Sequence, residues 1–259
     1  MTESEWLASE KPTRLFQQVR GRLSARKLKL LACGCCRLLD PLLTIAQRQT
    51  LAVVERHADG LAGQDEYQQA EETLYRAVNE WIHSPIAPPT DPTPTGEAAR
   101  APRPLESVEE AVAHALLRVV VTPADEGLYR TMEHVASATR RRVRPQGAMA
   151  VGPAKREVER QMCAVFREIV GNPFRETRAV GPEWLAAGGR AASGIVKVGE
   201  TARAIARGVE ADQAYDRLPI LADALEDDGC SDLELLAHLR GNSHHLRGCW
   251  AVDLVLGKS

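Results

Sequence analysis

The spacing of apolar residues along the chain predicts helices almost throughout. In residues 24–40 apolar side chains recur every three or four positions, which places them on one face of a helix. The same spacing recurs in residues 65–83, 105–120, 128–139 and 158–169. We therefore expect amphipathic helices that each bury one face.

The C-terminal part carries clear signals for helix starts and stops. Pro219 suits a first helical turn, and Gly229 suits the position after a last turn. Ser231 and Glu234 have the spacing of a capping box, which predicts that a short helix follows at 232–240. We expect two short consecutive helices in this region.

Three short apolar segments are open to a strand interpretation. Residues 246–257 predict a final buried helix, although the stretch 251–256 would also suit a strand. Residues 116–122 and 194–199 have strand character as well. Helical spacing dominates elsewhere, so the predicted fold class is all-α: a globular multi-helix bundle with a Pro-rich irregular insertion.

That insertion spans residues 84–105 and holds seven of the fifteen prolines. Such a segment cannot sustain a helix, and we interpret it as an exposed linker or loop, with a docking ligand as the alternative. It separates an N-terminal helical region, 1–83, from a C-terminal helical region, 106–259, unless the two form one continuous domain. Further breaks are expected at 145–153 and 188–194.

Composition excludes several classes of protein. The 259 residues carry a net charge of −2, which gives no overall attraction to nucleic acid or to anionic lipid. No apolar stretch approaches the length of a membrane span, and the six unevenly spaced cysteines do not suggest a disulfide framework. We expect a cytoplasmic protein with no membrane association, whose cysteines are thiols or metal ligands.

Several of these stretches together resemble a known group of sequences. The stretches are "RKLKLLACGCCR", "REIVGNPFR", "RLPILADALEDDGC", "LLAHLRG" and "HHLRGCWAVDLVLGK". In this combination the chain resembles an uncharacterised bacterial family, loosely over its first 60 or so residues and well over its last 90 or so. The activity of that family is unassigned, so the resemblance implies no catalytic residues.

The C-terminal histidines and cysteines are the first candidate site. Cys230, His238, His245 and Cys249 offer ligand types that zinc prefers, and His245 and Cys249 have the spacing of one helix face. The spacing matches no common zinc pattern, however, and cysteine is often a small buried apolar residue. We favour burial in the core and expect no cofactor, with zinc as the alternative.

Cys33 and Cys36 form a C-x-x-C motif, the second candidate site. Basic residues on the same helix face would lower a thiol pKa and favour redox chemistry: Arg22, Arg26, Lys29 and Arg37. A redox C-x-x-C belongs at a helix N-terminus, whereas this motif lies in the middle of a predicted helix. We favour core packing.

Arg140, Arg141, Arg142 and Arg144 form the third candidate site. Such a cluster could contact nucleic-acid phosphates. It also coincides with the end of a predicted helix, where cations complement the helix dipole without a ligand. We favour the solvated helix end, because no aromatic residue lies between the arginines.

Asp253 is predicted to be buried and must then have a cationic partner. The partners expected from the neighbouring sequence are Arg217, Arg240 and Arg247. A general-acid role is the alternative.

The first functional hypothesis is a non-enzymatic helical protein-interaction module or accessory subunit whose partner is another protein. The second is a nucleic-acid-associated accessory protein that uses the arginine cluster. The third is a metal-dependent enzyme or zinc-stabilised protein. Catalysis is disfavoured because no motif pairs a nucleophile with a base.

Overall fold

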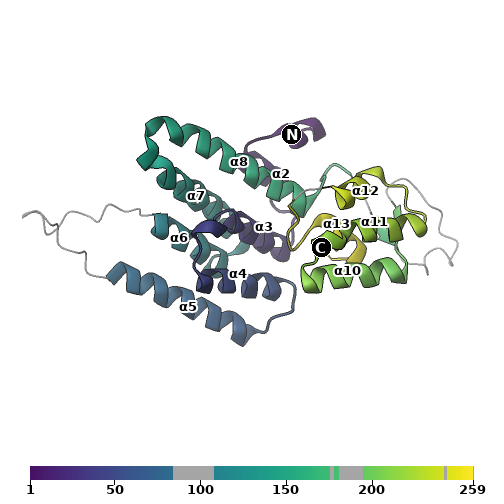
Figure 1. The fold of residues 1–259 in the computed structure, drawn as a ribbon, viewed down its shortest axis with the longest axis horizontal. Coiled ribbons are helices and arrows are strands. Elements are labelled where there is room, and N and C mark those ends of the chain that lie inside the picture. The colour runs from purple at the N-terminus through teal and green to yellow at the C-terminus, as the bar shows by residue number, and fades with distance from the viewer. Residues whose placement is uncertain (84–107, 176–177, 181–194, 242–243, 259) are drawn as a thin grey trace, which may run out of the picture. The chain divides into compact units, whose positions relative to one another are not determined.

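The computed structural model describes residues 1–83, 108–175, 178–180, 195–241 and 244–258 (Figure 1). The predicted proline-rich insertion at 84–105 and the predicted break at 188–194 lie outside these ranges. The chain divides into two compact units. Met1–Leu30 and Cys163–Ser259 form one, which we call the terminal unit, and Leu31–Met162 form the other, the central unit. The boundaries fall inside helices, where no change of composition marks them.

The central unit is built from helices that pack through their apolar faces. Its elements are the later part of α3 (Ala25–Arg37), η1 (Asp40–Leu42), α4 (Ile45–Ala58), α5 (Gln64–His83), α6 (Val108–Val121), α7 (Ala124–Val143), η3 (Arg144–Gln146) and most of α8 (Ala148–Val170). Helices α6 and α7 pack against each other most extensively, and α4 lies beside α5 (Figure 1). Thr44 caps α4 with a capping box.

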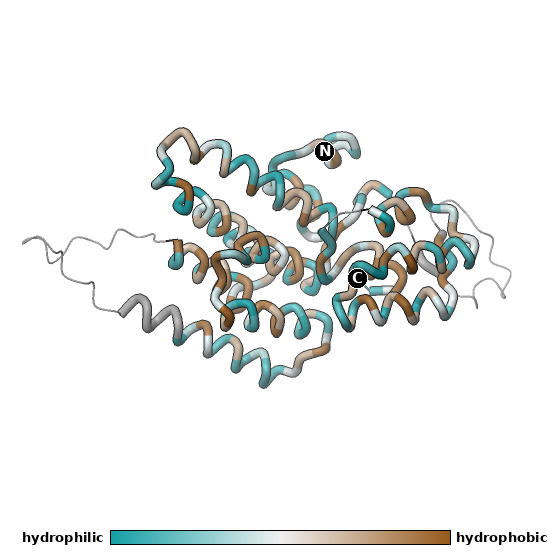
Figure 2. The backbone as a smooth tube through the Cα atoms, in the orientation of Figure 1, coloured by the Kyte–Doolittle hydropathy of each residue, from teal (hydrophilic) through white to brown (hydrophobic). Residues whose placement is uncertain are grey.

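The core of the central unit is apolar with a few satisfied polar groups. Leu51, Leu116 and Leu128 are fully or almost fully buried. The Tyr67 hydroxyl donates a hydrogen bond of 2.6 Å to the Val120 carbonyl, which satisfies a polar group that would otherwise be costly to bury. Hydrophobic and hydrophilic positions alternate along the helices in Figure 2, as expected for helices with one buried face.

The terminal unit combines the two ends of the described chain. Its elements are α1 (Glu3–Ala8), α2 (Pro12–Val19), the first part of α3, the last part of α8, β1 (Arg178–Val180), β2 (Ile195–Lys197), α10 (Glu200–Asp212), η4 (Tyr215–Arg217), α11 (Leu218–Asp227), α12 (Leu233–Arg240) and α13 (Trp250–Leu256). The strands β1 and β2 pair in parallel, with Arg178 opposite Ile195. The apolar faces of α10, α11, α12 and α13 enclose one core.

The N-terminal helix α1 is attached to the end of α8. Trp6 is fully buried, and its indole Nε1 donates to the Gly171 carbonyl at 3.2 Å. The Arg167 guanidinium donates to the carbonyls of Trp6 and Ser9 at 2.9 and 2.6 Å. Gly171 follows the last residue of α8 and adopts φ of 71°, the left-handed conformation that glycine commonly supplies at a helix end.

The predicted all-α fold class is confirmed. The three segments for which a strand was also considered are mainly helical. Residues 116–121 lie in α6 and 251–256 in α13, whereas part of 194–199 forms β2. The predicted break at 145–153 is shorter than expected, because α8 already begins at Ala148 and contains Pro153. Across the described ranges, no helix has both the length and the apolar character needed to cross a lipid bilayer.

The capping residue predicted for α12 is wrong by one position. Asp232, and not Ser231, is the N-cap, and its carboxylate accepts from the backbone N–H groups of Glu234 and Leu235, both at 3.0 Å. Either residue type can cap a helix, and the capping-box spacing to Glu234 suits only Ser231, so the pattern pointed to the residue that the backbone does not use.

Candidate metal centre

Four metal-binding side chains converge in the terminal unit: Glu168, His238, His245 and Cys249. One ligand atom from each lies within 4.8 Å of all the others. They come from the last part of α8, from α12, and from the segment that leads into α13. Residues far apart in the sequence therefore meet at one point.

Glu168 is held on the buried side of α8. It lies three positions after the buried Val165, and residues at this spacing share one helix face, so the helical repeat turns its side chain toward the core. Only 5% of the residue is exposed. A buried carboxylate needs a cation or hydrogen-bond donors nearby, and here its two oxygens lie 3.4 Å from His238 Nε2 and 3.1 Å from His245 Nδ1.

Cys249 and His245 are placed by a tight turn before α13. Gly248 adopts φ of 88°, and a Cβ atom at this position would lie 2.8 Å from Leu30 Cδ1. Glycine is therefore required both by the backbone conformation and by the close approach of Leu30. Cys249 follows directly as the N-cap of α13 and is 1% exposed.

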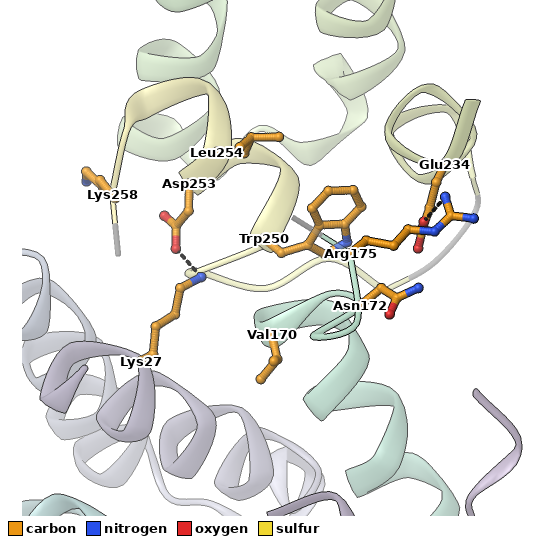
Figure 3. Close-up of a pocket in the computed structure, with 9 residues that line it drawn as sticks. All are labelled: Lys27, Val170, Asn172, Arg175, Glu234, Trp250, Asp253, Leu254 and Lys258. Atoms are coloured by element: carbon orange, nitrogen blue, oxygen red, sulfur yellow. Dashed lines mark ion pairs between the residues drawn. The ribbon is translucent and has the colours of Figure 1, made fainter. Parts of the chain in front are cut away.

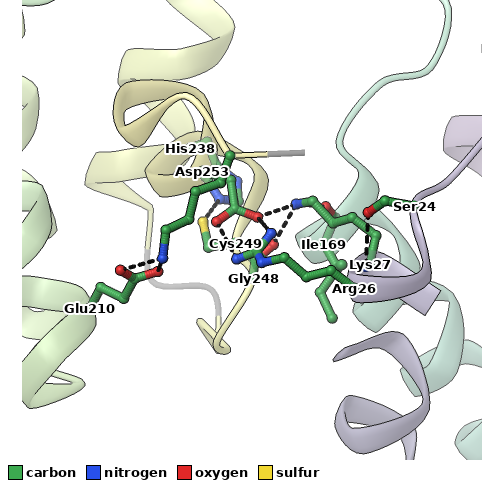
Figure 4. Close-up of polar contacts among 10 residues, drawn as sticks. Ser24, Arg26, Lys27, Ile169, Glu210, His238, Gly248, Cys249 and Asp253 are labelled. Atoms are coloured by element: carbon green, nitrogen blue, oxygen red, sulfur yellow. Dashed lines mark hydrogen bonds and ion pairs between the residues drawn. The ribbon is translucent and has the colours of Figure 1, made fainter. Parts of the chain in front are cut away.

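The ligand atoms are already in contact with one another. His238 Nε2 lies 3.2 Å from Cys249 Sγ (Figure 4) and 3.4 Å from the nearer Glu168 oxygen. His245 Nδ1 lies 3.1 Å from the other Glu168 oxygen. The two imidazole rings meet edge to face, with centroids 5.1 Å apart. These contacts link all four side chains.

Burial favours the neutral forms of the Cys249 thiol and the His238 imidazole. It raises the pKa of Cys249 well above its usual value, and the neighbouring Glu168 carboxylate raises it further. Burial also lowers the pKa of His238, which the Glu168 charge opposes. A bound cation would reverse only the state of the thiol, because metals bind the thiolate and the neutral imidazole.

The donor set fits zinc. One sulfur, two imidazole nitrogens and one carboxylate oxygen are all ligands that Zn²⁺ accepts in tetrahedral sites. Around a tetrahedral zinc ion, ligand atoms lie about 3.3–3.8 Å apart, given metal–ligand bonds of about 2.0–2.3 Å. The present spread of up to 4.8 Å is within a small side-chain adjustment of that geometry.

The structure brings together three of the four sequence-predicted metal ligands. Cys230 is not in the group, and Glu168 completes it instead. Cys230 is 8% exposed, and its backbone N–H donates to the Leu225 carbonyl at 2.8 Å in the turn that ends α11. The sequence signal for Glu168 is weak, because the residue lies only at the edge of the apolar face of the predicted helix at 158–169.

A buried lysine is hydrogen-bonded to the backbone beside two of the candidate ligands. The Lys27 ammonium donates to the Ile169 carbonyl at 2.8 Å and to the Gly248 carbonyl at 2.9 Å (Figure 4). Ile169 follows Glu168 in the sequence and Gly248 precedes Cys249, so Lys27 joins the backbones beside two ligands. Burial lowers the pKa of Lys27, and the ion pair that it makes with Asp253 opposes this shift.

Asp253 is buried and paired as predicted, but its predicted partners are wrong. Its carboxylate accepts two hydrogen bonds from the Arg26 guanidinium, at 2.7 and 2.8 Å, and also contacts Lys27 (Figure 4). The three arginines proposed from the nearby sequence contact other groups: Arg217 contacts Asp212, Arg240 contacts Asp223 and Glu226, and Arg247 contacts the Glu210 carbonyl.

A small hollow of about 200 Å³ adjoins the Lys27–Asp253 pair (Figure 3). Trp250 lies along it, and its charged lining residues are in ion pairs. Arg175 contacts Glu234 at 2.6 Å, and Lys258 contacts Glu210 at 2.6 Å. Because these charges are already neutralised, the hollow does not present a charged group to a ligand.

The predicted redox cysteines lie in the core of the central unit. Cys33 and Cys36 are 1% and 0% exposed, and all six cysteines of the chain are buried thiols. Burial raises the pKa of Cys36 well above its usual value, which is the opposite of what a reactive thiolate requires. The neighbouring Arg37 is held by a two-point contact with Glu55 at 3.0 and 2.8 Å.

The arginine cluster lies at a helix end. Arg140, Arg141 and Arg142 occupy the last turn of α7, and Arg144 is its C-cap residue. Cations at this position complement the negative end of the helix dipole.

Comparison of the chain with protein-family models, with curated proteins and with solved structures found no significant match.

Proposed function

We propose that this chain is a non-enzymatic helical protein whose terminal unit is stabilised by one structural zinc ion. The observation that carries the proposal is the convergence of Glu168, His238, His245 and Cys249 within 4.8 Å. The ligands would be Glu168 oxygen, His238 Nε2, His245 Nδ1 and Cys249 Sγ, since these atoms face one another.

Zinc suits this set better than other common metals. Magnesium and calcium prefer six or more oxygen ligands, and this group offers one carboxylate. Blue-copper sites have a weak, distant axial ligand, and non-haem iron sites leave coordination positions open. Four sulfur, nitrogen and oxygen donors that lie close together favour tetrahedral zinc instead.

The geometry favours a structural role over a catalytic one. Catalytic zinc sites have three protein ligands and leave the fourth position to water or substrate, whereas structural sites fill all four positions with side chains. Here four side chains are available, and Glu168, His245 and Cys249 are at most 8% exposed. An ion at this point would have no open position for a substrate.

Zinc would connect elements that are distant in the sequence. Glu168 lies 77 residues from His245, so the ion would join the end of α8 to α12 and to the start of α13. Because a metal that binds only the folded state adds its binding free energy to folding, these elements should unfold at lower temperature once the ion is removed.

The experiment compares two cysteine variants, of which only one is expected to lose zinc. Cys249→Ser removes a ligand, and Cys230→Ser makes the same change at a buried cysteine outside the group. Zinc per chain is measured by mass spectrometry on protein purified without an affinity tag. We expect about one zinc per chain in the wild type and in Cys230→Ser, and a small fraction of that in Cys249→Ser.

Two outcomes would contradict the proposal: a wild type that binds no zinc when supplied with it, or equal zinc loss in both variants. Glu168→Gln preserves the shape of the side chain and removes the charge, so it gives a second test should Cys249→Ser fold poorly. Circular dichroism confirms that each variant is helical before its metal content is compared.

A further inference from the structure

Helix α1 is attached to residues 167–172, a short stretch that also carries the proposed zinc ligand Glu168. The Trp6 indole donates to a carbonyl of this stretch, and the Trp6 carbonyl accepts from a guanidinium there. Asn172 Nδ2 donates to the Glu3 carboxylate at 2.6 Å. These contacts come from positions one before to four after Glu168, so a movement of this stretch would reach α1 directly.

Helix α1 depends on these contacts for its own stability. It has six residues, of which only Trp6 is buried. Isolated helices shorter than about 12–15 residues are marginal in water, and the capping box at Thr2 and Glu5 buries no apolar surface. We therefore expect α1 to unfold whenever Trp6 leaves its position, so that the exchange of its backbone amides reports whether it is docked.

Trp250 connects the same stretch to the other proposed ligands. It packs so closely on Gly171 that a Cβ atom there would lie 2.9 Å from Trp250 Cγ. Its ring also lies beside the His238 ring, with centroids 5.1 Å apart, and Trp250 follows Cys249 in the sequence. Because the Gly171 carbonyl accepts from Trp6, one residue joins the buried tryptophan of α1 to the tryptophan beside the ligands.

We propose that zinc binding controls whether α1 is docked, an inference that rests on the proposed zinc site. Glu168 is 5% exposed, and burying a carboxylate is costly unless a cation offsets the cost. When the ion leaves, residues 167–172 can reduce this cost by turning Glu168 toward water. That movement displaces the groups that hold α1.

The coupling between zinc and α1 must be reciprocal. A ligand shifts a conformational equilibrium only as far as its affinities for the two states differ, and the two states here are docked and undocked α1. The factor by which zinc lowers the equilibrium constant for α1 opening therefore equals the factor by which docking tightens zinc binding.

Hydrogen exchange of the full chain, measured by mass spectrometry with saturating zinc and with excess chelator, tests the coupling. Both samples are kept at a temperature at which circular dichroism shows them to be helical. We expect the amides of α1 to exchange at least about fivefold faster without zinc, the lower end of typical coupling between two sites. The matched control is α10, which belongs to the same unit but supplies no ligand, and its exchange should change by no more than about twofold.

Two arginine variants test the reciprocal effect. Arg167→Met keeps an apolar stem but removes the donors to the Trp6 and Ser9 carbonyls. It should bind zinc at least about fivefold more weakly in competition with a chelating dye, and its α1 should exchange rapidly even with zinc bound. Arg217→Met makes the same change at an exposed arginine of the same unit that contacts Asp212, and should match the wild type in both measurements.

Two results would overturn the coupling while leaving the zinc site in place. One is zinc that binds, and is removed by chelator, with no change in the exchange of α1. The other is acceleration of α10 as large as that of α1, which would indicate a general loosening of the terminal unit. A chain that binds no zinc would refute the zinc site and the coupling together.

Discussion

Replacing Lys27 with methionine should destabilise the terminal unit strongly. Methionine keeps an unbranched side chain of similar length but cannot donate to the Ile169 and Gly248 carbonyls at 2.8 and 2.9 Å. It also removes one of the two cations that contact Asp253. Lys27 and Asp253 are 8% and 2% exposed, so water cannot easily replace the lost contacts.

The magnitude follows from the contacts that are lost. Hydrogen bonds from a charged donor contribute about 1.5–3 kcal/mol each, and two are removed. Removing one partner of a buried ion pair costs about 3–5 kcal/mol, and Arg26 still pairs with Asp253. We expect a loss of about 3–5 kcal/mol in the free energy of unfolding, a large fraction of the roughly 5–15 kcal/mol typical of a domain.

The assay is urea unfolding followed by circular dichroism and tryptophan fluorescence, with Lys155→Met as the control. Lys155 is exposed and makes an i,i+4 helical ion pair with Glu159 at 3.5 Å, so the same substitution there should cost only about 0.3–0.5 kcal/mol. If Lys27→Met cost no more than Lys155→Met, the buried lysine would not fix the backbone beside the proposed ligands, and the reasoning would be refuted.

Three further predictions concern single positions. Gly171→Ala should lower the melting temperature, because its Cβ would lie 2.9 Å from Trp250 Cγ at a φ of 71°; an unchanged melting temperature would exclude this close approach. Asp232→Ala should cost about 0.5–2 kcal/mol in urea unfolding, because α12 loses its N-cap. Burial, and to a lesser extent the neighbouring His114, lowers the pKa of His134 to about 4 in the folded protein. Between about pH 6.5 and pH 4 the unfolded chain therefore binds more protons than the folded protein, and the free energy of unfolding falls as the pH falls through that window. His134→Gln should reduce this fall, measured as the urea midpoint at pH 7 and pH 5, and an equal fall in both proteins would contradict it.

The helices could be predicted from the sequence because their signals are local. A repeat of three or four residues and a glycine at a helix end depend on neighbouring positions, so α3, α5 and α11 follow from the residues themselves. The cap of α12 shows the limit of this reasoning, because Ser231 was predicted and Asp232 is observed. Two adjacent residues can both cap a helix, and only the backbone conformation selects one.

The candidate site could be predicted only in part because it depends on tertiary contacts. His238, His245 and Cys249 drew notice because they lie close in the sequence, whereas Glu168 is 77 residues from its histidine partner. The same limit applies to Asp253. Its burial required a cation, but the cations that it contacts are 226 and 227 residues away, which no local pattern indicates.

X-ray absorption at the zinc edge tests the central claim most directly, because it counts the atoms bound to the metal. The site identified here contains one cysteine, Cys249, whereas a site that also used Cys230 would contain two. We predict one zinc–sulfur distance of about 2.3 Å and three zinc–nitrogen or zinc–oxygen distances of about 2.0–2.2 Å. Two sulfur ligands, six-fold coordination, or protein that binds no zinc would contradict the account.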